Sequence, residues 1–257
     1  MKVLILSKEK IKNIGVVFLI VCIAVLFKLL GGYKLIDVFL NSKADLPIYS
    51  VETKEKRVAL TFDIGWGDEY IPSILKVLDD NNVKATFFIL GTWVDKYPNR
   101  VKEIDLKGHE IGNHSNNHIY FTRLTKSKIK EEVFTASSKI KKITGKETKL
   151  MRVPYGDYNS EVIKAIEETG HYCIQWDVDP IDWRTISHQQ IEKTVISKTR
   201  NGSIILLHNS SMETVKALDT IIKELKNKGY EFVKVSDLIY KDNYYIDFTG
   251  RQKPLSE

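Results

Sequence analysis

Cysteine is nearly absent from this chain of 257 residues, which contains only Cys22 and Cys173. Two cysteines make no disulfide framework. Cys22 lies in an apolar run, and Cys173 lies in a segment rich in β-forming residues, where a thiol behaves as a small buried apolar group. The cysteine content therefore neither supports nor excludes an extracellular location.

A strong excess of charge is also missing from most of the chain. The formal net charge is +6, and residues 1–34 supply +5 of it through six lysines and one glutamate. Subtraction leaves +1 for residues 35–257. A surface that follows nucleic-acid phosphates needs far more positive charge, so we expect no nucleic-acid partner.

The N-terminus carries the only long uncharged run. No charge occurs in the fourteen residues from Ile14 to Phe27, and four lysines precede them. This order is typical of an export signal or a signal-anchor whose positive end stays in the cytoplasm. The run is short for a spanning helix, although Lys28 can reach the lipid headgroups and so extend it.

We therefore predict a single-pass transmembrane helix within residues 1–32, which holds the rest of the chain outside the cell membrane. No A-x-A-like cleavage site follows the run. A cleaved signal, which would make the protein secreted, is the first alternative. A buried core helix is less favoured because the run has no polar face.

After Arg57 the chain alternates short β-type runs with helix-type stretches. The predicted strands are 58–63, 84–90, 109–113, 149–153, 172–178, 203–208 and 231–235. Apolar residues at spacings of three and four predict helices over 125–143 and 212–228. Strands joined by helical crossovers pair in parallel, so we predict an α/β fold, either a barrel or a doubly wound sheet.

The chain has room for one large domain, which we place at 57–240. Residues 33–56 are predicted to be a linker, and residues 241–257 a polar tail. No repeat or low-complexity tract suggests a second domain or an oligomer, so we expect a monomer.

The most reactive side chains follow the predicted strands at the point where each strand ends. They are Asp63, His114, Arg152, Asp179, Asp182 and His208. The carboxyl ends of parallel strands form one surface, which hosts the active sites of such folds. Scattered structural polar residues would show no such preference.

Two histidines four residues apart, His114 and His118 in H-S-N-N-H, can bind one cation from a tight loop or helical turn. Two histidines, a carboxylate such as Asp63 and an open position make a catalytic zinc-type site. The alternative is a pair of surface histidines on a polar loop. Gly65 and Gly67 after Asp63 indicate a loop that approaches a ligand closely.

The remaining polar residues allow two interpretations each. Arg152 can hold a carboxylate ionised, and Asp179 or Asp182 can anchor that arginine or tune a histidine. His208 is either a core histidine or a general acid. Trp66 and Trp183 are either buried or present flat faces to sugar rings.

Five segments together resemble the motifs of the polysaccharide deacetylase family, the NodB-homology domain of carbohydrate esterase family four. They are T-F-D at 61–63, H-S-N-N-H at 114–118, R-V-P-Y at 152–155, D-P-I-D-W at 179–183 and L-L-H at 206–208. The resemblance implies a distorted (β/α) barrel of about seven parallel strands. It also implies hydrolysis of N-acetyl groups on peptidoglycan or chitin-like glycans with release of acetate. A divalent metal, with Zn²⁺ expected, is the implied cofactor, and a cell-envelope polysaccharide is the implied partner.

On the base side of the site, the resemblance assigns four roles. Asp63 is the general base that activates water, and Arg152 orients Asp63. His114 and His118 are metal ligands.

On the acid side, the resemblance assigns five more residues. Asp182 raises the basicity of His208, which protonates the leaving amine. The backbone N–H of Tyr155 stabilises the oxyanion, and Leu206 and Trp183 form the wall of the acetyl pocket.

One position departs from the family pattern. Members usually have an aspartate ligand directly after the base, and Ile64 stands there instead. This first-strand segment most resembles a sporulation-associated branch of firmicute deacetylases, which also varies here. Asp68 is a candidate third ligand or, alternatively, a cap for the helix that follows. Otherwise water completes the site, the metal binds weakly and an aspartate at 64 would strengthen it, or the chain is a glycan-binding pseudoenzyme.

Overall fold

The computed structural model describes residues 45–255, which belong to one compact unit, Asp45–Glu257. The predicted transmembrane helix at 1–32 and the first half of the predicted linker, residues 33–44, lie outside these residues. Within the described range, no helix is both long and apolar enough to cross a membrane.

Seven parallel strands form the main sheet, as predicted. They are β2 (Arg57–Ile64), β3 (Thr86–Ile89), β4 (Glu110–Asn113), β5 (Leu150–Met151), β6 (Tyr172–Cys173), β7 (Ile204–His208) and β8 (Glu231–Val233). Their order is β6-β5-β4-β3-β2-β7, and β8 pairs with the start of β2. The chain after β6 reaches β7 through a parallel bridge between Val178 and Ile205. The sheet therefore curves into a distorted, incompletely hydrogen-bonded barrel.

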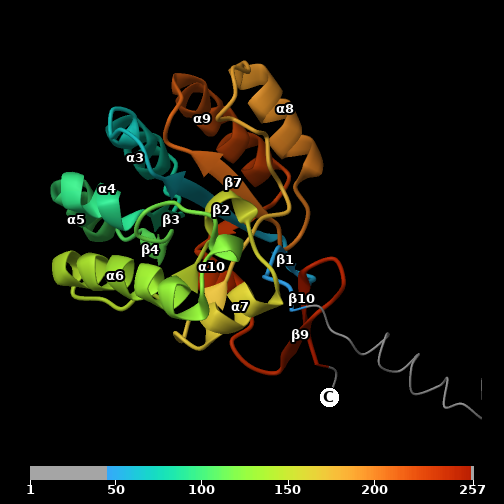
Figure 1. The fold of residues 1–257 in the computed structure, drawn as a ribbon. Coiled ribbons are helices and arrows are strands. Elements are labelled where there is room, and N and C mark those ends of the chain that lie inside the picture. Colours follow the sequence, from blue (N-terminus) through green and yellow to red (C-terminus); the bar gives the residue numbers. More distant parts are fainter. Residues whose placement is uncertain (1–44, 256–257) are drawn as a thin grey trace, which may run out of the picture. The chain divides into compact units, whose positions relative to one another are not determined.

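Helices surround the strands on the outside (Figure 1). They are α3 (Ile71–Asp80), α4 (Gly91–Lys96), α5 (Pro98–Leu106), α6 (Lys126–Thr144), α7 (Ser160–Glu167), α8 (His188–Lys198), α9 (Met212–Asn227) and α10 (Val235–Leu238). The two helices predicted from periodicity correspond to α6 and α9. The Thr125 side chain accepts a hydrogen bond from the first turn of α6, and Gly145, with φ of 73°, ends that helix.

Strand β2 separates two environments. Leu60, Phe62 and Ile64 belong to the apolar core that also contains the buried faces of α3 and α9. Thr61 and Asp63 alternate with them and face the opposite side, because successive side chains of a strand point to opposite faces. This alternation puts the catalytic candidate Asp63 inside the barrel and Ile64 outside it.

One end of the barrel is closed. The backbone of α10 donates hydrogen bonds to Thr86 and Glu110, which are the first residues of β3 and β4. This helix therefore covers the amino ends of the strands. The site residues lie at the other end, where the carboxyl ends of the strands meet.

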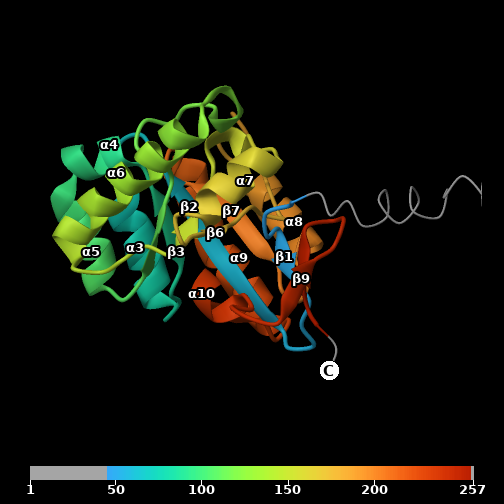
Figure 2. The same ribbon diagram turned by 60° about the horizontal axis from the view of Figure 1, so that its bottom comes forward.

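The domain boundaries expected from the sequence differ from the structure at both ends. The strands β1 (Ser50–Val51), β10 (Arg251–Pro254) and β9 (Tyr244–Ile246) form a second, three-stranded sheet in that order. Part of the predicted linker thus pairs with the predicted tail beside the barrel (Figure 2). These strands of two to four residues are too short to show a period, and only their mutual pairing defines them.

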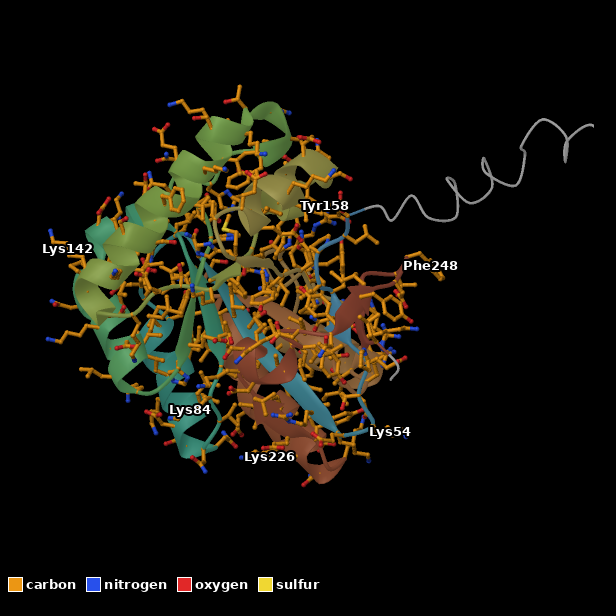
Figure 3. The ribbon with its side chains drawn as sticks, turned by 90° about the horizontal axis from the view of Figure 1, so that it is seen from below. Lys54, Lys84, Lys142, Tyr158, Lys226 and Phe248 are labelled. Carbon is orange, nitrogen blue, oxygen red and sulfur yellow. The ribbon has the colours of Figure 1, made fainter. Side chains whose placement is uncertain are left out.

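Residues of this small sheet are buried against the rest of the domain. Val51 and Gln252 are buried, and Gln252 hydrogen-bonds both backbone groups of Tyr240. Figure 3 shows Phe248 projecting outward, and it is the connection between β9 and β10 that carries it. The sheet therefore extends the domain to both ends of the described chain.

Candidate active site

Neighbouring strands bring the motif residues together. Asp63 and His208 are register partners at the ends of β2 and β7. His114 follows β4, and its N–H donates to Ile89 O at 3.1 Å. Arg152 follows β5 and donates its N–H to Asn113 O at 2.9 Å. Backbone pairing therefore fixes four of the predicted site residues at one end of the barrel.

Asp63 is held by a buried ion pair. Arg152 is fully buried, and its Nη1 lies 2.7 Å from Asp63 Oδ1 and 2.8 Å from Thr61 Oγ1. Its Nη2 donates to Gln175 O at 3.0 Å, which fixes the plane of the guanidinium. Burial by itself raises the pKa of Asp63, but the charge and hydrogen bond of Arg152, together with the neighbouring His114 and His208, outweigh it and hold the pKa below the ordinary value. Asp63 is therefore a carboxylate at neutral pH.

His208 has a carboxylate partner of its own. Its Nδ1 lies 2.7 Å from Asp182 Oδ1, and its backbone N–H donates to Asp182 Oδ2 at 2.9 Å. Thr214 donates to the same Oδ2 at 2.8 Å, so the buried carboxylate has three partners. Burial lowers the pKa of His208, but the hydrogen bond and charge of Asp182 outweigh it and raise the pKa above the ordinary value.

The two motif histidines lie next to each other, with ring centroids 5.2 Å apart. His114 Nδ1 donates to Arg152 O at 2.8 Å, since a carbonyl oxygen only accepts; Nε2 is therefore left with a free lone pair. That Nε2 lies 3.6 Å from Asp63 Oδ2. Within residues 45–255, the buried Nδ1 of His118 has no hydrogen-bond partner.

Both imidazoles are neutral at pH 7. Burial lowers the pKa of His114, and burial together with neighbouring His114 lowers the pKa of His118 to about 4. Neutral imidazole is the form that binds a metal. The two side chains therefore have the protonation state and the free nitrogen atoms of metal ligands.

A third protein ligand is not grouped with them. No cluster of three or more His, Cys, Asp or Glu side chains suited to a metal occurs in the described part of the chain. Ile64 is fully buried in the apolar core. Asp68 instead pairs with Arg100 on α5, Oδ2 to Nε 2.9 Å.

The capping alternative for Asp68 is wrong. Helix α3 begins at Ile71 without any side-chain cap, and only the backbone carbonyl of Asp68 accepts a hydrogen bond there. The loop between Asp63 and α3 is held by other contacts that the sequence did not suggest. Trp93 Nε1 donates to Gly67 O at 2.7 Å, and Asn209 donates to the carbonyls of Trp66 and Gly67.

Exposed aromatic rings border the histidines. Trp66 is 62% exposed and packs edge-on against His118, with centroids 4.8 Å apart. Tyr155 is 55% exposed and packs at 4.4 Å against the same imidazole. Trp183, next to Asp182, is 56% exposed. Both tryptophans thus lie at the surface rather than in the core.

The Tyr155 backbone adopts a left-handed conformation with φ of 61°. This conformation is uncommon outside glycine and, besides turns, is found at functional sites. Tyr155 lies in the first turn of the short 3-10 helix Pro154–Gly156. Its N–H therefore has no partner within that helix and can donate to a ligand.

Two further predicted residues, Leu206 and Asp179, lie near the site without bonding to His208. Leu206 is buried and lies two residues before His208 on β7, so both side chains face the same side. Asp179 accepts a hydrogen bond from Ile181 N–H at 2.6 Å and shapes the turn that leads to Asp182. Of the two acidic candidates in this motif, only Asp182 bonds to His208.

Comparison with known proteins settles the family. A family model described as polysaccharide deacetylase matches residues 50–174. Peptidoglycan-N-acetylmuramic acid deacetylase PdaA of Bacillus subtilis is 36% identical over 75% of this chain and 75% of its own length. The chain belongs to the polysaccharide deacetylase family. The resemblance based on five motifs is thereby confirmed.

Other relatives in the polysaccharide deacetylase family share similar identity. A peptidoglycan-N-acetylglucosamine deacetylase of Bacillus cereus is 37% identical over 74% of this chain and 92% of that protein. The uncharacterized protein YlxY of B. subtilis is 35% identical over 79% of this chain, and the match spans 63% of YlxY. The enzyme class expected from the motifs is therefore confirmed at the level of the family.

Solved structures of the family confirm the fold and add a second possibility. Wild-type BA3943 of Bacillus anthracis, described as a CE4 family pseudoenzyme, has a TM-score of 0.72 and 34% identity, over 75% of this chain and 68% of that one. A BA3943 mutant described as having restored enzymatic activity has a TM-score of 0.73 and 35% identity, over 75% and 70%. Membership in this family therefore includes both enzymes and pseudoenzymes.

Proposed function

We propose that this chain is a peptidoglycan N-deacetylase, which hydrolyses the N-acetyl groups of cell-envelope glycan and releases acetate. One observation carries the proposal. The ion pair of Asp63 with Arg152 and the hydrogen-bonded pair of His208 with Asp182 stand on adjacent strands at the same register position. The pKa of the carboxyl is lowered and that of the imidazole is raised, which is the direction that a base and an acid of an amide hydrolysis require.

Asp63 acts first in this proposal. Its Oδ1 is committed to Arg152, and its Oδ2, on the side of His114, is free to take a proton from the attacking water. Arg152 holds the carboxylate in place through the step. The tetrahedral oxyanion accepts a hydrogen bond from the N–H of Tyr155.

His208 completes the reaction. Asp182 accepts the hydrogen bond from Nδ1, which leaves Nε2–H to protonate the nitrogen of the departing amine. Leu206 and Trp183 enclose the acetyl methyl group. Amide hydrolysis needs this proton because a free amide anion is a very poor leaving group.

A divalent metal, with zinc as the expected ion, fits two of the residues present. His114 and His118 would hold it through their uncommitted nitrogen atoms. When bound, such an ion lowers the pKa of its water and polarises the carbonyl group. With two imidazoles and no clustered third side chain, we expect weaker retention of the metal than at a three-ligand site.

A second candidate function has one specific observation in its favour. Ile64 occupies the core at the position of the usual aspartate ligand, and relatives of this fold include pseudoenzymes. In that case the chain binds glycan through Trp66 and Trp183 and releases no acetate.

We also propose that the N-terminal run anchors a monomeric enzyme in the cell membrane as a single-pass protein, with its catalytic domain outside. Its uncharged residues after four lysines support this orientation. Protease added to intact protoplasts should then digest the domain, and protection of the domain would overturn the topology.

The proposed activity is tested by acetate release from N-acetylated peptidoglycan strands with purified full-length protein. The His208→Ala variant should lose about 10²–10⁴-fold in rate on the amide. Its loss should be smaller on a matched O-acetyl ester, whose alkoxide leaving group needs less help from a proton. Equal losses on amide and ester would contradict the role of His208, and glycan binding without acetate from the wild type would favour the pseudoenzyme.

A further inference from the structure

A row of stacked side chains leads away from His118 along the rim of the site. Tyr155 packs against His118, and Tyr120 stacks on Tyr155 with ring centroids 4.2 Å apart and planes 13° from parallel. The guanidinium of Arg123 lies over the Tyr120 ring, 4.5 Å from its centroid. We call these residues, Tyr155, Tyr120 and Arg123, the rim stack.

Hydrogen bonds between neighbouring segments hold the rim stack in place. Arg123 and Tyr155 come from two separate loops, and Thr122 ties them together through its N–H and hydroxyl, both bonded to Asp157 at 2.8–2.9 Å. Tyr155 holds an uncommon left-handed backbone, and yet its ring remains 55% exposed. An exposed ring in a costly conformation indicates a contact with something outside the fold.

The geometry defines what the rim stack can bind. Tyr120 stacks on Tyr155 and also lies under the guanidinium of Arg123, so we assign this ring a supporting role rather than a sugar-stacking one. The Tyr120 ring supports the guanidinium of Arg123. Stacking occupies the face of the guanidinium and leaves its in-plane N–H donors free. Within residues 45–255, no carboxylate lies within 4 Å of Arg123, although most neighbouring cations of this surface are paired.

We propose that the rim stack is a subsite for a carboxylate carried by the glycan. The planar fork of an arginine matches a carboxylate in bidentate fashion. Because Arg123 lies two aromatic rings beyond His118, the carboxylate belongs to the sugar beside the acetylated one and not to the reacting acetamide. The inference rests on the proposed function, since it assumes that a glycan strand crosses this face.

Binding of defined glycans tests the subsite without requiring turnover. The fluorescence of exposed Trp66 and Trp183 reports binding of full-length protein to peptidoglycan oligosaccharides that carry lactyl carboxylates. The comparison ligand is the same preparation with its carboxylates reduced to alcohols. Wild type should bind the acidic form about three- to tenfold more tightly, and Arg123→Gln should erase that difference.

Three variants make the result specific. Tyr120→Phe keeps the stacking ring and should keep the preference, whereas Tyr120→Leu removes the support of the guanidinium and should reduce it. Arg184→Gln is the matched control, because Arg184 also lies over an exposed ring, that of Trp183 at 4.8 Å. It should leave the preference intact.

Equal affinity of wild type for acidic and reduced glycan would overturn the subsite, and so would an equal loss in Arg184→Gln. These outcomes are separable from failure of the proposed activity. If the acidic glycan is preferred through Arg123 but no acetate is released, the hydrolase proposal fails and the subsite stands. If acetate is released without any preference, the subsite fails alone.

Discussion

The proposed base, Asp63, and the proposed acid, His208, are distinguished by their partners. Replacing Asp63 by asparagine removes the proton acceptor but keeps an oxygen for Arg152, so the fold should persist. We expect acetate release to fall by about 10²–10⁴-fold with little loss of bound zinc. Acetate assays and metal analysis of the same sample check this. A variant within a few-fold of wild type would show that another group is the base.

The pH dependence of activity should depend on Asp182. His208 has a raised pKa, so its protonated form is favoured in the folded state and is lost as pH rises through that value. In Asp182→Asn the neighbouring charge and its hydrogen bond to His208 are weakened, and the alkaline limb of the rate profile should move to lower pH.

The pH dependence of the stability lost in Asp182→Asn should have the same cause and direction. The charged pair of His208 with Asp182 contributes fully to the free energy of unfolding below the ordinary histidine pKa, and this contribution is lost above the raised pKa. The difference in unfolding free energy between wild type and variant should therefore become smaller as pH rises through the raised pKa of His208. Chemical unfolding at a series of pH values measures it. An unchanged alkaline limb would show that His208 is not the acid.

At the scale of elements, the end of β2 determines whether position 64 can contribute to the proposed metal site. The sequence suggests that an aspartate at position 64 would repair the missing ligand. In the structure Ile64 lies in the core, on the strand face opposite to Asp63. We therefore expect Ile64→Asp to lower the free energy of unfolding by about 2–4 kcal/mol, because it buries a carboxylate without a partner.

Ile64→Val is the control for this variant and should cost about 0.5–1.5 kcal/mol. Added zinc should not restore the stability of Ile64→Asp in urea unfolding. Restoration by zinc would mean that the new carboxylate reaches His114 and His118, and that the strand end differs from the arrangement described here.

The loop after β2 gives a further prediction. Asp68 pairs with Arg100 at a partly exposed position, so Asp68→Ala should cost less than about 1 kcal/mol of unfolding free energy. Zinc content and acetate release should stay close to wild type, as measured by metal analysis and acetate assay. Loss of most of the metal would instead identify Asp68 as the third ligand.

Several elements were predictable from sequence, and the reasons are physical. Strands such as β2 and β7 are buried on both faces and are rich in apolar and β-branched residues, and α9 shows its spacing of three and four. The convergence of Asp63 with His208 followed from the rule that parallel strands end at one surface. Such features are local in sequence or follow from topology alone.

Other features were beyond the sequence. The pairing of β1 with β10 joins residues two hundred positions apart and leaves no periodic pattern. The pairing of Asp68 with Arg100 and the bond from Arg152 to Gln175 O depend on which groups the fold places nearby. The stack of Tyr120 on Tyr155 occurs where Tyr155 has a left-handed backbone, and a tyrosine in the sequence does not predict that conformation.

At the scale of the whole molecule, α10 covers the amino ends of β3 and β4, and the proposed catalytic groups lie at the carboxyl ends of the strands. Residues from β2, β4, β5 and β7 meet only when the barrel is complete. The same arrangement would bind glycan in a pseudoenzyme, so the shape alone does not separate the two functions. Turnover that depends on a metal does separate them.

The most direct measurement is acetate release from N-acetylated peptidoglycan as zinc is returned to chelated, full-length protein. We predict no release after chelation, a rise to saturation near one zinc ion per chain, and no recovery in Asp63→Asn. Many acetate molecules should be released per chain. Glycan binding without acetate at any zinc concentration, or release that chelation leaves unchanged, would contradict a metal-assisted deacetylase.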